Sequence, residues 1–423
     1  MINLRYFTFV LITSGLLGSK LLSIRSIVGQ ISLYRIMIII SPIIILAKYI
    51  LQKNEFSKIK NSEVSIFYLL WAIYSVMQVA IIGDLIRWAR VFWFFISGVI
   101  TILFSLQYLR NKSDILKILK ILLIVIIIYQ VFAFYEILSG NYIFENEYNQ
   151  DYYSTALANI GIRIPISLCG NPNDFGLFCI MAFYVALSYN KIFKKRLGKA
   201  ISFLLEITSI FLVFATQSRG NIIGLLISIP FLLIMQYKIE IAWKRIILVF
   251  LIVFIVMYVF LITPIYNEVI KELVTIDFRA KSGSIYIREN LIRNGLIYLK
   301  KYFYMGVGLG NIEFHMGINP IFDVGKYRNI HNWWMEILVS SGLFIFIGYV
   351  YIYVKTSINL IEIYKNFKDK DFKFLAISFF CYMIAFIVGS ISSSTIIDVE
   401  WIWVFWAIIY SFINIYKINK EGI

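Results

Sequence analysis

Long runs of apolar residues, bounded by charged or turn-forming residues, recur along most of the chain. A helix needs about 20 apolar residues to cross the hydrocarbon core of a bilayer. The pattern therefore predicts an all-α, polytopic integral membrane protein with about twelve transmembrane helices. The predicted spans lie at residues 4–23, 31–51, 64–82, 88–109, 115–138, 172–190, 199–217, 220–237, 244–263, 332–354, 374–392 and 399–417.

The composition agrees with a membrane location. Of the 423 residues, 60% are hydrophobic and 15% are charged, whereas soluble chains carry about a quarter charged residues. Apart from the stretch at about 263–330, the polar intervals are too short for a separate soluble domain, so we expect residues 1–423 to form a single membrane domain. The N-terminal apolar stretch lacks a clear small-residue cleavage site, and we interpret it as the first span.

The formal charge of +16 could suggest nucleic-acid binding, but the charges lie in the loops between spans. We therefore expect the lipid bilayer, and no nucleic acid, as a partner. The predicted inner loops are much richer in Lys and Arg than the short outer loops, which predicts that both termini are cytoplasmic. The same orientation places one large loop, 264–330 between the ninth and tenth spans, outside the membrane.

Both histidines of the chain, His315 and His331, fall in or beside this loop. Residues 284–299 have helical apolar spacing and predict a helix at the membrane interface that carries Arg288. Gly306-Val307-Gly308-Leu309-Gly310 follows as a flexible turn. It is not preceded by the strand of a dinucleotide site, and its glycines would let backbone N–H groups approach an anion.

Two further polar segments adjoin predicted spans. Arg163 precedes Asn171-Pro172-Asn173-Asp174, which is typical of a loop that enters a helix. Ser218-Arg219-Gly220 forms a tight turn between two spans. Arg219 either extends to lipid headgroups or binds a diphosphate through its planar guanidinium. Both interpretations stay open from the residues alone.

His331 and Asn332 stand at the start of the tenth span, where a helix N-terminus favours negative charge. A histidine is suited to moving protons near neutral pH, and nearby arginines and the helix N-terminus should keep it neutral. A structural role is the alternative.

The sequence offers no metal site. Glu336 is five residues after His331, which does not suit a His–Glu metal pair, and three zinc ligands cannot be assembled. The three cysteines are too scattered for a disulfide framework or a metal site. We expect no metal and no cofactor.

Together these segments resemble the O-antigen ligase and Wzy-type polysaccharide polymerase family of bacterial membrane glycosyltransferases. The resemblance covers roughly 160–350 as a ligase/polymerase-like core. Its motifs occur in the order Arg163 with Gly170-Asn171-Pro172-Asn173, Ser218-Arg219-Gly220, Arg288 before the glycine turn, and His331-Asn332 with Glu336 and Ser341-Gly342. The long loop has fewer aromatic and acidic residues than a wide glycan surface needs, and the acidic, Tyr-rich segment 139–160 is the candidate to supply that surface.

The resemblance implies metal-independent transfer of a glycan from an undecaprenyl-diphosphate carrier, on the outer face of the bacterial inner (plasma) membrane. It implies that Arg219 and Arg288 hold the donor diphosphate and that His331 activates or orients the acceptor hydroxyl. The substrate-binding residues expected beside them are Arg163, Asn171, Asn173, Ser218, Gly308, Gly310, Asn332 and Glu336.

Three functions fit this resemblance and this topology. We favour a polymerase of surface polysaccharide (O-antigen, capsule or exopolysaccharide), which would work with a chain-length regulator and a flippase. An O-antigen ligase that delivers finished glycan to a terminal acceptor uses the same donor, so the motifs do not separate the two. A flippase or transporter of lipid-linked oligosaccharide is the third, although such proteins usually show related halves, and the halves of this chain look dissimilar.

Overall fold

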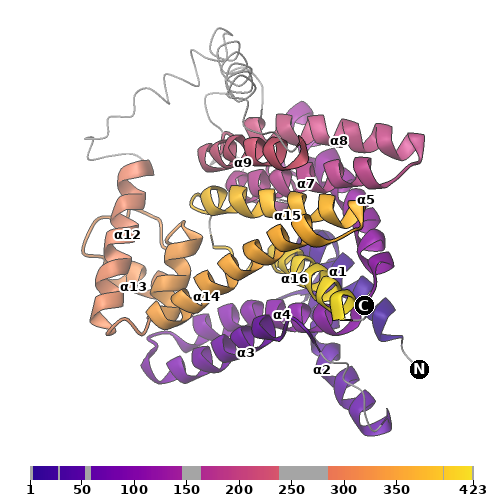
Figure 1. Cartoon of the computed structure of the whole chain (residues 1–423). Helices are drawn as coiled ribbons and strands as arrows, with labels where there is room; N and C mark the ends of the chain where they lie inside the picture. The colour runs from indigo at the N-terminus through magenta and orange to yellow at the C-terminus, as the bar shows by residue number, and fades with distance from the viewer. Residues whose placement is uncertain are drawn as a thin grey trace. The chain divides into compact units, whose positions relative to one another are not determined.

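The computed structural model of this protein describes residues 3–26, 29–52, 59–144, 163–237, 284–393 and 395–421. These residues are mostly helical, with a single short pair of strands (Figure 1). The chain divides into two compact units, each built from segments that are distant in sequence. Unit 1 comprises Met1–Val125, Leu291–Ile363 and Thr395–Ile423, and unit 2 comprises Ile126–Asn290 and Tyr364–Ser394.

Unit 1 contains most of the N-terminal helices, the helices that follow residue 284, and the C-terminal helix. A short antiparallel pair of strands, with Ile24 opposite Ile31, joins its first two helices. Its elements are α1 (Leu4–Leu21), β1 (Ser23–Ser26), β2 (Gly29–Ser32), α2 (Leu33–Gln52), α3 (Ser62–Met77), η1 (Gln78–Ile81), α4 (Leu85–Tyr108), the first part of α5 (Lys112–Ser139), most of α12 (Ser284–Lys301), α13 (Asn311–Ile318), most of α14 (Trp333–Asn366) and α16 (Glu400–Glu421).

The core of unit 1 forms around α16, which packs against α1 and α4. Asn414 of this helix is fully buried, and its side-chain oxygen accepts hydrogen bonds from the backbone N–H groups of Lys60 (2.9 Å) and Asn61 (3.0 Å). Its amide group donates to the Leu106 carbonyl at 3.1 Å. One polar side chain thus ties the C-terminal helix to the start of α3 and the end of α4.

Besides the second part of α5 and the first residues of α12, unit 2 contains five further elements. They are η3 (Ser167–Cys169), α7 (Pro172–Ile192), α8 (Arg196–Ala215), α9 (Arg219–Tyr237) and α15 (Lys370–Gly389). Helix α7 packs against α8, α9 and α15, and most of its residues are buried. Close approach of α9 to α15 depends on Gly224, because a Cβ there would lie 2.6 Å from the Ala385 carbonyl oxygen.

Among the described residues, nine helices are long and apolar enough to cross a membrane, and each matches a predicted span. Helices α1 and α2 occupy the positions of the first two predicted spans. Helix α1 is not among the nine, and the apolar stretch of α2, Leu33–Leu46, is shorter than a full span. The predicted span at 244–263 lies outside the described residues. The all-α, polytopic class is confirmed, and the number twelve stays a prediction.

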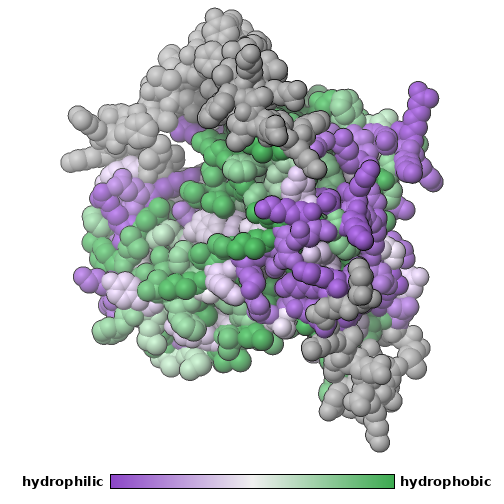
Figure 2. All heavy atoms as spheres, in the orientation of Figure 1, coloured by the Kyte–Doolittle hydropathy of each residue, from purple (hydrophilic) through white to green (hydrophobic). Residues whose placement is uncertain are grey.

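Apolar side chains also cover part of the surface of unit 1. In Figure 2 they are prominent over α3 and α14. They include Ile66, Leu70 and Ile73 of α3 and Phe344 and Ile347 of α14, each more than half exposed. Exposed apolar faces of this kind are expected where helices contact lipid.

Candidate functional site

The predicted site residues are divided between the two units. Unit 2 carries Arg163, Asn171, Asn173, Ser218, Arg219 and Arg288, and unit 1 carries Gly308, Gly310, His331, Asn332 and Glu336. Each group is described within its own unit.

In unit 2, Asn171 caps the start of α7. Its side-chain oxygen accepts hydrogen bonds from the backbone N–H groups of Asn173 (2.8 Å) and Asp174 (3.4 Å), which is the usual way that an asparagine begins a helix. The carbonyl of Asn173 accepts a hydrogen bond from the side-chain amide of Asn221 at 2.6 Å. The helix begins at Pro172, as the predicted span does, but its N-cap is Asn171, whereas the sequence favoured Asn173 or Asp174 as the cap. Asn173 is linked to α9 through its backbone.

Ser218 is buried in the turn before α9, whereas Arg219 is exposed at the first position of that helix. Asn221 donates a hydrogen bond to the Ser218 hydroxyl at 2.8 Å, and the hydroxyl of Ser392 lies 3.4 Å from that of Ser218. Arg219 forms no ion pair with any described residue. The turn is therefore held by buried polar contacts that leave the guanidinium of Arg219 accessible. Asn221, which the sequence analysis missed, is the residue that holds it.

Arg163 lies over the ring of Tyr142, with 4.8 Å between the guanidinium carbon and the ring centre. The segment that follows is fixed by Glu136 of α5, which is buried. One oxygen of Glu136 accepts hydrogen bonds from the N–H groups of Ile166 and Ser167, each at 2.8 Å. Glu136 could have been found in the sequence, because an ionisable residue within a predicted span marks a functional or structural role.

The helix predicted at 284–299 is present as α12, and Arg288 is half-buried on it. In unit 1 the buried face of this helix includes Leu291, Tyr298 and Leu299, while Leu296 is exposed. Whether α12 lies at a membrane interface stays a prediction.

The glycine turn of unit 1 packs directly on the first turns of α14. The Gly308 N–H donates to the Ser340 carbonyl at 2.9 Å. Gly306 has φ +85°, and a Cβ there would lie 2.5 Å from the Ser340 carbonyl oxygen and the Gly342 nitrogen. The glycines therefore allow backbone to lie against backbone. The amide of Gly308 is committed to this contact, so it does not point at an anion as the sequence suggested.

His331 and Asn332 precede α14, which begins at Trp333. The side chain of Asn332 accepts a hydrogen bond from the Met335 N–H at 3.2 Å, and its carbonyl accepts from the Glu336 N–H at 2.8 Å. His331 has φ +50°, a left-handed conformation that non-glycine residues rarely adopt. Its ring meets Tyr327 edge-on at 5.6 Å. Strained backbone of this kind clusters at functional sites.

Glu336 is buried and contributes to a cavity of about 200 Å³ in unit 1. Its carboxylate accepts hydrogen bonds from the Thr395 hydroxyl and from the Ile396 N–H (3.2 Å). The cavity is lined by Arg87, Arg90, Val91, Phe94, Gly310, Ile312, Glu313, Asn329, Ile330, Glu336, Ser340, Thr395, Ile397 and Asp398.

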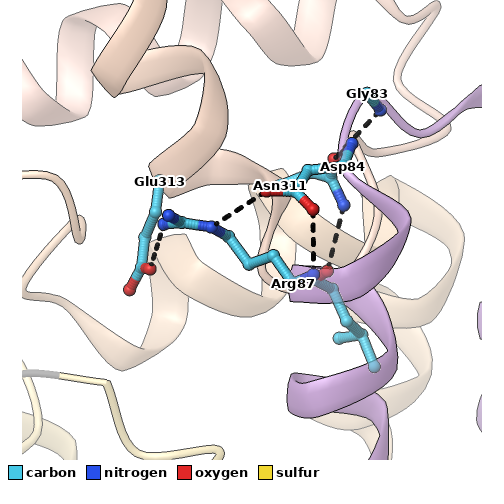
Figure 3. Close-up of polar contacts among 6 residues, drawn as sticks. Gly83, Asp84, Arg87, Asn311 and Glu313 are labelled. Atoms are coloured by element: carbon cyan, nitrogen blue, oxygen red, sulfur yellow. Dashed lines mark hydrogen bonds and ion pairs between the residues drawn. The ribbon is translucent and has the colours of Figure 1, made fainter.

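One wall of this cavity is a polar network between α4 and α13 (Figure 3). Arg87 donates to Glu313 at 2.7 Å, and its Nε lies 3.5 Å from an oxygen of Asp84. The side-chain oxygen of Asn311 accepts hydrogen bonds from the N–H groups of Gly83 (3.0 Å) and Asp84 (2.9 Å). In the sequence, Arg87 and Arg90 appear only as cations near the end of a predicted span. No neighbouring residue indicates that Arg87 has a partner 226 residues away.

The second histidine has a packing role. The ring of His315 lies among the rings of Tyr298, Tyr302 and Phe314, with centroid distances of 5.2, 5.4 and 5.4 Å. Burial, and then the charge of Lys301, lower the pKa of His315 below its ordinary value, so the neutral form is favoured. Across the described parts of the chain, no group of three His, Cys, Asp or Glu side chains could hold a metal ion.

Comparisons with known proteins agree with the resemblance predicted from the sequence. Residues 204–350 match the family model of the O-antigen ligase family (Wzy_C). The chain is also 22% identical to the teichuronic acid biosynthesis protein TuaE of Bacillus subtilis (strain 168), across 98% of this chain and 85% of that protein. The matched segment contains Ser218, Arg219, Arg288 and His331.

Proposed function

Because residues 204–350 carry the segment that defines the O-antigen ligase family, we propose that this protein polymerises a surface polysaccharide. In this proposal it transfers a glycan from undecaprenyl diphosphate to a sugar hydroxyl of an acceptor glycan, on the outer side of the bacterial plasma membrane. The proposal is supported by the position of Arg219, Arg288 and His331, which all lie within the segment that matches the family model. A chain-length regulator and a flippase are the partners that such a reaction requires.

The proposed role of Arg219 and Arg288 is to hold the donor diphosphate. Arg219 is exposed at the start of α9 and makes no ion pair with a described residue, so its guanidinium is available to a ligand. Negative charge grows on the diphosphate as the bond between the sugar C1 and the phosphate oxygen breaks. A fixed cation that meets this charge lowers the barrier, and the loss of one such contact typically costs about 10²–10³-fold in rate.

His331 is proposed as the general base. The acceptor oxygen attacks C1 of the donor sugar, the acceptor proton passes to the imidazole, and undecaprenyl diphosphate leaves. The products are the glycosidic bond, the free lipid diphosphate and a protonated histidine, which then loses its proton to solvent. General base catalysis contributes roughly 10²–10⁴-fold.

The two histidines of the chain provide a matched pair of variants. We expect His331→Gln to abolish glycan transfer while the protein still inserts into the membrane. His315→Gln, which changes a packed ring outside the proposed mechanism, should retain transfer. Equal activity of His331→Gln and wild type in an assay with lipid-linked donor would remove His331 from the mechanism.

The size distribution of surface polysaccharide separates the candidate functions. Cells that lack this gene should lose long chains and retain single repeat units if the protein is a polymerase. The family description favours one alternative, an O-antigen ligase. In that case long chains would persist but remain on the carrier lipid. Accumulation of lipid-linked repeat units on the inner leaflet would instead indicate a flippase.

A further inference from the structure

The chain makes a tight turn directly after α12, and three side chains of this turn are large, apolar and exposed. Phe303 is 84% exposed, Tyr304 52% and Met305 54%. A run of three such residues on a surface that faces water is unfavourable unless a partner covers it. The turn, residues 302–305, is therefore a candidate interaction surface.

The backbone of this turn favours glycine, yet the chain has aromatic residues there. The Tyr304 N–H donates to the Leu299 carbonyl (2.9 Å), and the Phe303 N–H donates to the Lys300 carbonyl (3.1 Å). These two bonds end α12 as a Schellman motif, in which glycine usually takes the left-handed position. Phe303 has φ +51° and Tyr304 has φ +60°, values that bulky residues rarely adopt. Because the turn itself requires no aromatic ring, the exposed side chains need another explanation.

The turn is held against two candidate membrane helices of unit 1. The Met305 carbonyl accepts hydrogen bonds from the Tyr74 hydroxyl (2.7 Å) and from the Gln78 side-chain amide (2.8 Å), at and just after the end of α3. The Tyr304 carbonyl accepts one from the Leu343 N–H of α14 at 2.9 Å. All these residues belong to unit 1, so the position of the turn follows from the position of α3 and α14.

Leu343 is the first residue after a kink in α14. The helix changes direction at Gly342, which has non-helical φ and ψ. Residues 343–366 remain long enough, at about 1.5 Å per residue, to cross the hydrocarbon core. The exposed apolar face of this part begins with Phe344, and α3 ends at Met77, which is 69% exposed. The turn therefore lies where two lipid-facing helices end, which is the level of the lipid headgroups.

Two exposed lysines adjoin the aromatic residues. Lys300 and Lys301 end α12, and neither forms an ion pair with a described residue. Lysine side chains extend from apolar surroundings to polar headgroups, and lysines near an anionic membrane surface strengthen binding to it. Tyrosine likewise prefers the boundary between hydrocarbon and water. The turn and the lysines beside it thus suit the interface of a bilayer.

We propose that residues 302–305 insert into the headgroup region of the bilayer, with Lys300 and Lys301 at the phosphates of anionic lipids. Leu291 and Leu299 of α12 are buried in unit 1, so the turn, and not that face of α12, makes the membrane contact. Amphipathic segments at an interface bury their apolar groups by about 5–10 Å. This contact fixes the chain between α12 and the glycine turn at the membrane surface, and it does not depend on the proposed glycan transfer.

The depth of single nitroxide labels tests the insertion. The full-length protein, without its native cysteines, is reconstituted in vesicles of phosphatidylcholine and phosphatidylglycerol. Labels are attached to Phe303→Cys, to Lys300→Cys, and to Leu70→Cys on the exposed face of α3. Molecular oxygen concentrates in hydrocarbon and a nickel chelate in water, so the ratio of their collision rates with a label reports its depth.

We expect oxygen to collide more often than the nickel chelate with the label at position 303, as at position 70, and the opposite order at position 300. An excess of chelate collisions at position 303 would overturn the proposal, because the turn would lie in water. Low collision rates of both reagents at position 303 would also overturn it, because protein and not lipid would cover the turn.

Titration of phosphatidylglycerol into the detergent-solubilised protein, followed by the rise in Tm, tests the lysines. Lys300→Gln and Lys301→Gln should each weaken the apparent affinity for this lipid by about fivefold. Lys326→Gln is the matched control, because it removes an exposed lysine elsewhere in unit 1, and it should bind like wild type. Equal affinity of wild type and both turn variants would show that no lipid phosphate lies at these lysines.

Phe303→Gly separates lipid contact from packing. Glycine suits the left-handed position, so this variant should unfold no earlier than wild type in detergent alone. Its affinity for phosphatidylglycerol should nevertheless fall, because the ring that contacts the lipid is lost. A lowered Tm with unchanged lipid affinity would mean that the ring only packs against the protein, and the proposed insertion would be wrong.

Discussion

Replacement of Asn311 by alanine should destabilise unit 1 substantially. The side chain is fully buried and makes three hydrogen bonds, to the N–H groups of Gly83 and Asp84 and to the Leu309 carbonyl (3.2 Å). A buried hydrogen bond contributes roughly 0.5–1.5 kcal/mol, which gives about 1.5–4.5 kcal/mol for three. Gly83 is exposed, so its N–H can bond to water in the variant. We therefore expect a loss of about 2–3 kcal/mol.

The assay is unfolding of the purified protein in mixed micelles by increasing SDS, followed by tryptophan fluorescence. Asn319→Ala is the matched control, because Asn319 is exposed at the end of the same helix and exposed positions usually change stability by less than about 0.5 kcal/mol. If Asn311→Ala and Asn319→Ala unfold at the same SDS fraction, the three hydrogen bonds do not hold α13 against the start of α4.

Three further predictions concern the glycine turn, the donor site and the topology. Gly306→Ala should destabilise by more than about 2 kcal/mol in the same unfolding assay, because a left-handed alanine is strained and its Cβ would meet backbone. Gly317→Ala, whose nearest neighbour atom would be 3.8 Å away, should cost much less, and equal losses would refute the argument. Arg219→Lys should slow glycan transfer by about tenfold or more because a bidentate contact is lost. Arg196→Lys, also exposed at the first position of a helix, should not, and an active Arg219→Lys protein would show that charge alone suffices. In a background without native cysteines, Lys300→Cys should react with a membrane-impermeant maleimide added to intact cells. Labelling only after lysis would reverse the predicted orientation.

The membrane class could be predicted because bilayer thickness imposes a length on every span, and runs of that length are visible in the sequence. Helix starts were less accurate, because a polar cap outside the apolar run decides where a helix begins. The span predicted from residue 374 begins at Lys370, since Asp369 accepts a hydrogen bond from the Asp371 N–H at 2.9 Å. Likewise α4 begins at Leu85, where Asp84 caps it.

The candidate site was predictable only where its residues act locally. The start of α7 was predicted from the turn at Asn171-Pro172, although the capping side chain is that of Asn171 and not that of Asn173 or Asp174. Arg87 was missed as a site residue because its partner Glu313 is distant in sequence. The contact between the Gly308 amide and α14 was missed for the same reason, because it leaves no signal in the neighbouring residues.

The burial of α16 affects how the protein is made. In the most apolar part of this helix, 89% is buried inside the protein. Its partners α1 and α4 both lie in the first segment of unit 1, Met1–Val125. Ribosomes add roughly 5–20 residues per second, so the partners wait roughly 15–60 s in the bilayer before α16 is synthesised. During that interval lipid, or the insertion machinery, must cover the faces that α16 later occupies. Helix α16 therefore completes a core that helices synthesised much earlier began.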